Sequence, residues 1–157
     1  MYVHEQTTTL TRDYSDDHTR NPLRQEQEMS FKSCHRLLCV DGHADSFEML
    51  SALLKLSKIE SESAGTAAQA LSKANAESFD LYLLEAWLPD LDGFELCRQL
   101  RNSDPHTPIV FFSAAAYDAD RSRAILAGAN EYVAKPDITG LLEIISKHIP
   151  DVEMVTV

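Results

Sequence analysis

Short apolar runs alternate with helix-like stretches along most of the chain, from residue 36 onward. Runs such as LLCV, LYLL and IVFF are long enough for strands but too short for helices. Between them, apolar residues recur every three or four positions, which is the spacing of one buried helix face. The pattern predicts strands at residues 36–40, 59–63, 81–85, 108–114 and 130–136, and helices at 44–56, 67–74, 94–100, 120–127 and 141–149.

Five strand and helix units in about 115 residues predict a parallel sheet, because each parallel return needs a crossover of helix length. Right-handed crossovers then distribute the helices over both faces of the sheet. Residues 108–114, PIVFFSA, have the apolar character of a central strand that is buried on both faces. Residues 59–63, IESES, hold one apolar residue and indicate an edge strand. Gly128 stands where the fourth helix should end.

The two ends of the chain lack this pattern. Residues 1–33 mix charged, amide and hydroxyl side chains with scattered apolar ones, which predicts a disordered N-terminal tail. A short helix at Arg24–Met29 that docks on the domain or on a partner is the alternative. We therefore expect one domain, residues 34–150, followed by a short C-terminal tail at residues 151–157.

Composition narrows the class of protein. A chain of 157 residues, 44% of them hydrophobic, suffices for one core. The net charge of -11 disfavours binding to phosphate backbones and to anionic membranes, so we expect neither a nucleic acid nor a membrane as partner. Three cysteines without CxxC spacing suit a reducing compartment. Since no apolar run approaches the roughly 18 residues of a membrane span, we expect a cytoplasmic protein.

Polar side chains stand where four of the predicted strands end. Asp41 follows the first strand, Glu85 ends the third, Ser113 ends the fourth and Lys135 follows the fifth. Because parallel strands bring their carboxyl ends to one edge of the sheet, these side chains should share a crevice. Two carboxylates, a hydroxyl and an amine there suit a site for a metal ion or a phosphoryl group.

Four segments carry a resemblance to a known family, and they are VDGHAD, DLYLLEAWLPDLDGFELCRQLR, TPIVFFSA and AGANEYVAKP. In this order and at these intervals they resemble the CheY-like receiver domain of bacterial two-component response regulators, over residues 35–149. The resemblance implies a flavodoxin-like, doubly wound sheet of five strands in the order 2-1-3-4-5. It also implies an acidic pair that binds Mg²⁺ after the first strand, and a phosphoacceptor aspartate at the end of the third.

Matched position by position, the resemblance gives Ser113, Tyr132 and Lys135 as phosphate-contact or switch residues. It also implies a cis peptide bond before Pro136 and a backbone carbonyl of Trp87 that faces the metal. Two residues depart from the family pattern: Glu85 stands at the phosphoacceptor position, and Gly42 replaces the second acid of the pair. We therefore expect no cofactor and at most weak binding of Mg²⁺ by Asp41, Glu85 and Trp87.

The departures suggest how the domain acts. A glutamate carries its oxygens about 1.5 Å further than an aspartate, and a misplacement of about 1 Å can cost 10²-fold in catalysis. Phosphotransfer at Glu85 should suffer, and a fixed carboxylate there would imitate the phosphorylated state, imperfectly because it carries one charge. We expect a non-enzymatic, stand-alone receiver that contacts a histidine kinase or an output protein through its last two helices and fifth strand, since no output domain follows Val157.

Alternative hypotheses about the site and the class of protein remain open, except where specific residues exclude them. Glu85 is alternatively a tolerated remnant paired with Lys135, or part of a conventional receiver that retains Mg²⁺-dependent phosphotransfer. Trp87 has a packing role or contacts a partner. A haloacid-dehalogenase-like phosphohydrolase needs two aspartates spaced by one residue after the first strand, and Asp41-Gly42-His43 lacks the second. The oligomeric state is open, as is a separate metal site that uses His43.

Overall fold

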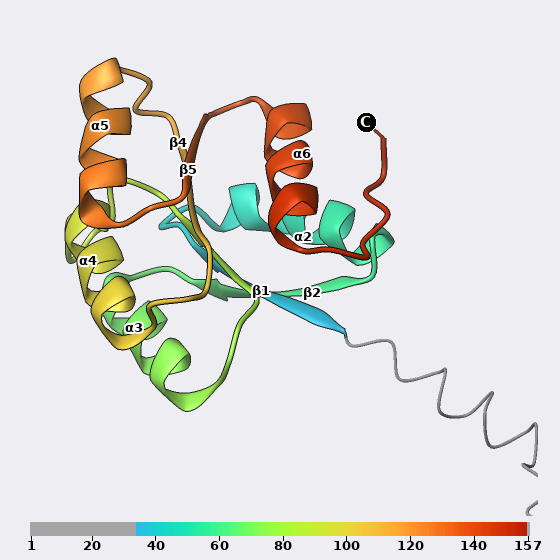
Figure 1. The fold of residues 1–157 in the computed structure, drawn as a ribbon, viewed down its shortest axis with the longest axis horizontal. Helices are drawn as coiled ribbons and strands as arrows, with labels where there is room; N and C mark the ends of the chain where they lie inside the picture. The colour runs from blue at the N-terminus through green and yellow to red at the C-terminus, as the bar shows by residue number, and fades with distance from the viewer. Residues whose placement is uncertain (1–33, 157) are drawn as a thin grey trace, which may run out of the picture. The chain divides into compact units, whose positions relative to one another are not determined.

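The computed structural model describes residues 34–156, so the predicted N-terminal tail and the alternative helix at Arg24–Met29 lie outside the described residues. The strands are β1 (His35–Val40), β2 (Ile59–Ala64), β3 (Leu81–Leu84), β4 (Ile109–Ser113) and β5 (Glu131–Ala134). The helices are α2 (Ala44–Leu56), α3 (Ala67–Ala76), α4 (Gly93–Ser103), α5 (Asp118–Ala127) and α6 (Ile138–His148) (Figure 1).

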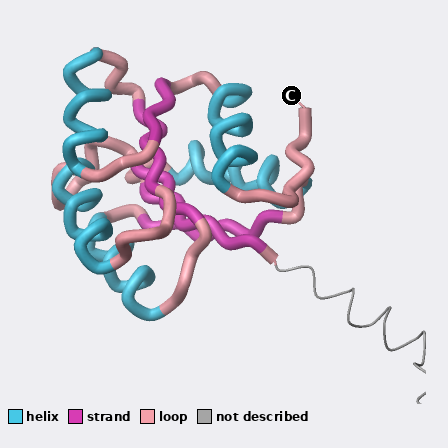
Figure 2. The backbone as a smooth tube through the Cα atoms, in the orientation of Figure 1, coloured by secondary structure: helices cyan, strands magenta, loops and turns pink. Residues whose placement is uncertain are grey.

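The five strands form one parallel sheet in the order β2-β1-β3-β4-β5, which confirms the predicted fold (Figure 2). The edge position of β2 and the interior position of β4 are also as predicted. Side chains alternate between the two faces of each strand. In β1, Leu38 and Val40 join the core beneath α3, α4 and α5, whereas Leu37 and Cys39 join the core beneath α2 and α6.

Element boundaries differ from the predicted ones where a cap or a turn decides them. The last helix begins at Ile138 because the Asp137 side chain accepts a hydrogen bond from the Gly140 amide, 2.8 Å away. Strand β3 ends at Leu84, so Glu85 lies just beyond the strand rather than within it. By contrast, α5 ends at Gly128 as predicted, and this glycine has a left-handed conformation with φ of 108°.

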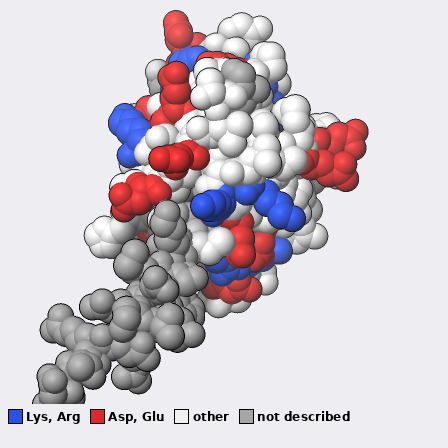
Figure 3. Space-filling view, turned by 90° about the vertical axis from the view of Figure 1, so that its right-hand side faces the viewer, with Lys and Arg blue, Asp and Glu red and all other residues white. Residues whose placement is uncertain are grey.

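Charged side chains cover much of the surface. Figure 3 shows one face of the molecule, on which acidic side chains surround a small group of basic ones. On the first strand, the Arg36 guanidinium contacts the carboxylates of Glu62 and Glu77, and Lys73 pairs with Glu62 at 3.0 Å. These basic side chains of β1 and α3 are therefore paired with acidic ones. In the part of the chain that the structure describes, no helix is long and apolar enough to cross a membrane.

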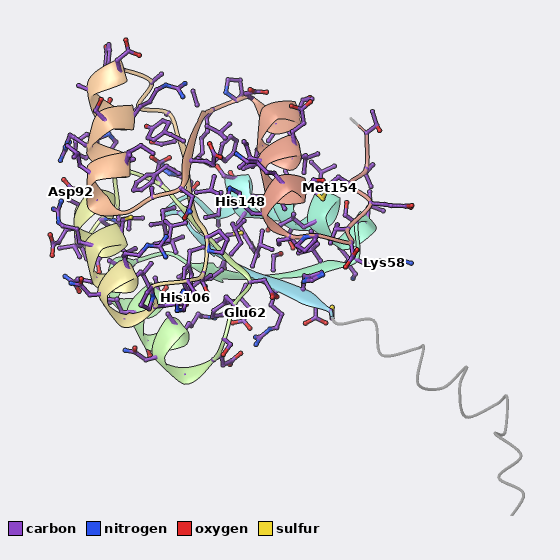
Figure 4. The ribbon with its side chains drawn as sticks, in the orientation of Figure 1. Lys58, Glu62, Asp92, His106, His148 and Met154 are labelled. Atoms are coloured by element: carbon purple, nitrogen blue, oxygen red, sulfur yellow. The ribbon has the colours of Figure 1, made fainter. Side chains whose placement is uncertain are left out.

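The segment after α6, which the sequence predicts to be a short tail, lies against the core. Val152 and Met154 are partly buried against the side chains between α2 and α6 (Figure 4). The Val155 amide donates a hydrogen bond to the Ser57 hydroxyl, 3.1 Å away. Apolar residues at alternate positions of an extended segment face one side, and this spacing allows both to reach the core.

We expect Met154→Gln to lower the free energy of unfolding by about 1 kcal/mol, because a half-buried apolar side chain of similar length becomes polar. The matched control is Glu153→Gln, an exposed neighbour, for which the change should stay within about 0.5 kcal/mol. Urea denaturation of both variants makes the comparison. Equal stability of the two variants would show that the segment does not rest on the core.

A lysine between two carboxylates at the carboxyl edge of the sheet

The structure brings Asp41, Glu85, Ser113 and Lys135 together at the carboxyl ends of the strands. The Lys135 ammonium donates hydrogen bonds to Asp41 Oδ2 at 2.7 Å and to Glu85 Oε2 at 3.0 Å. The other oxygen of Glu85, Oε1, accepts from the Ser113 hydroxyl and from the Ala86 amide. Glu85 is thus bound on both of its oxygens.

Backbone hydrogen bonds beyond the strand ends hold these side chains in place. The Glu85 amide donates to the Val40 carbonyl at 2.9 Å, and the Lys135 amide donates to the Ser113 carbonyl at 2.9 Å. The Asp41 amide likewise donates to the carbonyl of Ala64 at 3.0 Å. The four polar side chains therefore extend from backbone that continues the ladder of the sheet.

Burial makes this ion pairing necessary. Glu85 is only 6% exposed, and a buried carboxylate without partners would be costly. Burial alone would lower the pKa of Lys135, but its hydrogen bonds to Asp41 and Glu85 raise that pKa above the usual value. Burial would raise the pKa of Asp41, but the hydrogen bonds from Lys135 and the His43 amide lower it. These contacts favour the ammonium form of Lys135 and the carboxylate form of Asp41.

The donor set does not suit Mg²⁺. This ion requires near-ideal octahedral oxygen coordination, but Lys135 stands between the two carboxylates and Gly42 offers no side chain. Within residues 34–156, no three His, Cys, Asp or Glu side chains gather in a way that could hold a metal ion, so the His43 alternative finds no site there. The His43 ring instead faces Asp41, with Nδ1 3.2 Å from Oδ1.

Gly42 is not required by the backbone. A Cβ atom there would lie 3.4 Å from Pro89 Cδ and 3.8 Å from the Gly65 carbonyl oxygen, both ordinary contacts. Gly93 differs, because a Cβ atom there would collide with the Glu85 carbonyl oxygen. The loop after β3 thus packs closely on the start of α4, whereas an acid at position 42 would find room.

The remaining predicted residues surround this cluster. Tyr132 is almost fully buried, and its hydroxyl donates to the Ala115 carbonyl. The Ala115 amide in turn donates to the Ser113 hydroxyl at 3.2 Å. The Lys135–Pro136 peptide bond is cis. The Trp87 side chain is 59% exposed, so most of it lies outside the core.

Sequence reasoning missed Asp90, which fixes the loop that carries Glu85 and Trp87. Its carboxylate accepts hydrogen bonds from the amides of Ala67 and Ala68, at 2.8 and 3.0 Å, and so caps the start of α3. These hydrogen bonds lower the pKa of Asp90. The local sequence shows only Thr66 as the cap of this helix, and no local pattern links it to a residue so far along the chain.

The fold and this cluster can now be compared with known proteins. A family model described as the response regulator receiver domain matches residues 37–146. The chain belongs to this family. Receiver domains are in general signalling modules that interact with histidine kinases and output proteins.

Several curated relatives of this receiver domain are named as transcriptional regulatory proteins. The chain is 44% identical to the transcriptional regulatory protein CreB of Escherichia coli over 66 residues, which are 42% of this chain and 29% of CreB. It is 34% identical over 101 residues to the alkaline phosphatase synthesis transcriptional regulatory protein PhoP of Bacillus subtilis, covering 64% of this chain and 42% of PhoP. This receiver domain therefore spans less than half the length of these relatives.

Solved structures of receivers have the same fold. The CheY-like receiver domain protein of Methanospirillum hungatei is 30% identical, with a TM-score of 0.70 over 73% of this chain and 93% of the other. A two-component response regulator of Clostridium difficile is 28% identical, also with a TM-score of 0.70, over 73% of this chain and 94% of the other.

We expect the contribution of Asp41 to the stability of this receiver to depend on pH in a defined direction. A carboxyl whose pKa is lowered by folding stabilises the fold above its unfolded pKa of about 3.9, and this stability is lost as the pH falls through the folded value. Asp41→Asn should therefore lower the free energy of unfolding by about 1 to 2 kcal/mol at neutral pH. The difference from wild type should shrink as the pH falls below about 4, and it should vanish once the pH is below the lowered folded pKa.

Urea denaturation between pH 3 and pH 8 checks this expectation, with Glu48→Gln as a control for loss of one exposed carboxylate of α2. The control should change stability by no more than about 0.5 kcal/mol. A cost of Asp41→Asn that stays constant down to pH 3 would contradict the ion pairing with Lys135.

Proposed function

We propose that this receiver acts by contact with a separate protein and does not depend on phosphorylation, because Glu85 stands at the phosphoacceptor position and imitates the phosphorylated state. The observation that supports this most directly is the contact set of Glu85. Its two oxygens bind Ser113 and Lys135, the residues matched to those that contact a phosphoryl group. One side chain thus makes both contacts without any group transfer.

The additional methylene of glutamate is what makes this arrangement work. It carries the carboxylate away from the β3 backbone to the hydroxyl on β4 and the ammonium after β5 at the same time. The imitation is partial, since a carboxylate carries one negative charge and a phosphoryl group nearly two. A nucleophile that is already hydrogen-bonded on both oxygens is also poorly placed for in-line attack on a phosphodonor.

We expect the contact surface to be on α5, β5 and α6, and exposed apolar side chains support the α5 part of it. Ile125 and Leu126 of α5 are 53% and 86% exposed, and Tyr117 precedes them at the start of the helix with 79% exposure. Large apolar side chains gathered on one element often mark a protein interface. We propose that a histidine kinase or an output protein binds this surface. The three free thiols favour the cytoplasm as its compartment.

We expect wild-type protein to gain no phosphoryl group from acetyl phosphate and Mg²⁺, because Glu85 is engaged and the donor set for the metal is incomplete. Glu85→Asp with Gly42→Asp should regain the added mass, since position 42 has room for an acid. Mass spectrometry makes the measurement, and Glu85→Gln with Gly42→Asp is the matched control without a nucleophile. A phosphoryl group on wild-type Glu85 would establish the conventional receiver instead.

A second expectation concerns the partner. Shortening or neutralising the side chain withdraws its charge from Ser113 and Lys135, and a population shift requires such a differential interaction. Glu85→Asp and Glu85→Gln should therefore weaken binding of a cognate kinase or output protein by about 1 to 3 kcal/mol, the usual range of allosteric coupling. Isothermal titration of the three proteins tests this. Equal affinities would leave Glu85 as a tolerated remnant.

A further inference from the structure

Three aromatic rings form a buried column between the sheet and α5. Phe94 of α4 stacks on Phe111 of β4, with ring centroids 5.1 Å apart and an interplanar angle of 19°. Phe111 stacks on Tyr132 of β5, with centroids 5.7 Å apart and an angle of 7°. The column therefore joins α4, β4 and β5.

An arginine from α5 lies over the ring at each end of this column. The Arg123 guanidinium is 4.1 Å from the centroid of Phe94, and that of Arg121 is 5.3 Å from the centroid of Tyr132. Guanidinium groups at these distances are attracted to the face of an aromatic ring. Both cations belong to one helix and stand two positions apart.

Each arginine also hydrogen-bonds close to the ring that it covers. Arg121 Nη1 donates to the Tyr132 carbonyl at 3.0 Å. Arg123 Nη2 pairs at 2.9 Å with Asp92, labelled in Figure 4, whose other oxygen accepts from the Phe94 amide and caps α4. One arginine thus ties α5 to β5 and the other ties it to α4.

Few other contacts of α5 could hold it in place. Its buried residues are Asp120, Ala124 and Ala127, and none has a large apolar side chain. Its two large apolar residues, Ile125 and Leu126, are exposed. Helices are held mainly by the burial of an apolar face, and α5 has little of one. Arg121 and Arg123 replace part of that missing burial.

Two further contacts link the Tyr132 end of the column to the ion cluster, which consists of Asp41, Glu85, Ser113 and Lys135. The Tyr132 hydroxyl donates to the Ala115 carbonyl, and the Ala115 amide donates to the hydroxyl of Ser113, which binds Glu85. Residues that fix Tyr132 and α5 therefore stand between the cluster and the exposed face of α5.

We propose that Arg121 and Arg123 are positioning residues that clamp α5 and keep Tyr132 buried, whatever group occupies the position of Glu85. The link to output rests on the proposed function, which assigns partner contact to the face that includes α5. The clamp itself rests on the column alone. It differs from an ordinary surface ion pair such as Arg98 with Glu95, which lies within α4.

Nitration of tyrosines by tetranitromethane, followed by peptide mapping, tests the clamp in the full chain. Tyr117 is the exposed reference and Tyr82, only 2% exposed, is the buried reference. In wild type, Tyr132 should react as slowly as Tyr82. Arg121→Gln should raise the nitration of Tyr132 about two- to fivefold, the scale of a lost cation–π contact at an exposed site. Protection of Tyr82 should persist, which shows that the fold is intact.

Two further variants separate positioning from a general loss of stability. Arg121→Lys keeps a cation over the ring and should restore at least half of the protection of Tyr132. Arg98→Gln, matched in charge and exposure, should leave Tyr132 protected. Hydrogen exchange of the α5 amides should accelerate in Arg121→Gln and Arg123→Gln, and not in Arg98→Gln. Nitration and exchange identical to those of Arg98→Gln would overturn the clamp.

Glu85→Gln distinguishes this inference from the proposed function. The clamp predicts that Tyr132 stays protected in Glu85→Gln, even if phosphoryl uptake by wild type disproves the imitation. Exposure of Tyr132 in Glu85→Gln to the same extent as in Arg121→Gln would overturn the clamp, because the tyrosine would then be held by Glu85.

Discussion

Two carboxylates at the ends of neighbouring strands need a cation between them, and Lys135 supplies it. Asp41 and Glu85 follow β1 and β3, which pair directly in the sheet, so their charges would otherwise repel in a place with little water. The parallel topology brings the lysine to them, since it follows β5 and reaches across the end of β4. Ser113, the His43 amide and the Ala86 amide then satisfy the remaining oxygens.

The ion cluster also relates the missing acid at position 42 to the role of Lys135. With no acid at position 42, the lysine balances both carboxylates, and the positive charge that a metal would bring is already present in the chain. The same lysine holds Glu85 toward Ser113, whose hydroxyl meets the loop that leads to α5. The negative charge at this end of β3 belongs to the Glu85 side chain itself.

Much of the fold could be predicted from the sequence because the strong signals are local. The unbroken runs of β1, β3 and β4 and the helical spacing between them are each contained in a few residues. The convergence of Asp41, Glu85, Ser113 and Lys135 follows from the parallel topology once the strand ends are known. The cluster and the pairing of Glu85 with Lys135 were therefore foreseeable. The second ion pair of Lys135, with Asp41, was not, since a lysine at a strand end has several acids within reach.

Other features depend on contacts that no local pattern records. Asp90 caps a helix that begins much earlier in the chain, and the three rings of the column come from three separate elements. From the sequence alone, Arg121 and Arg123 would be read as solvated residues on the surface of a helix. Their contacts with Tyr132 and Phe94 are visible only in the structure. Val152 and Met154 are too few to form a hydrophobic period, so their contact with the core could not be predicted from the sequence.

The acidic edge strand has a consequence for the behaviour of the protein in a crowded cell. Within residues 34–156, strand β2 pairs with β1 alone, which leaves one row of its backbone groups without a strand partner. Such a row can template the addition of strands from other molecules. Glu60 is exposed on this strand, so a second copy paired there would bring two like charges together at the same edge. The low apolar content that makes β2 hard to recognise in the sequence thus protects the molecule against edge-to-edge aggregation.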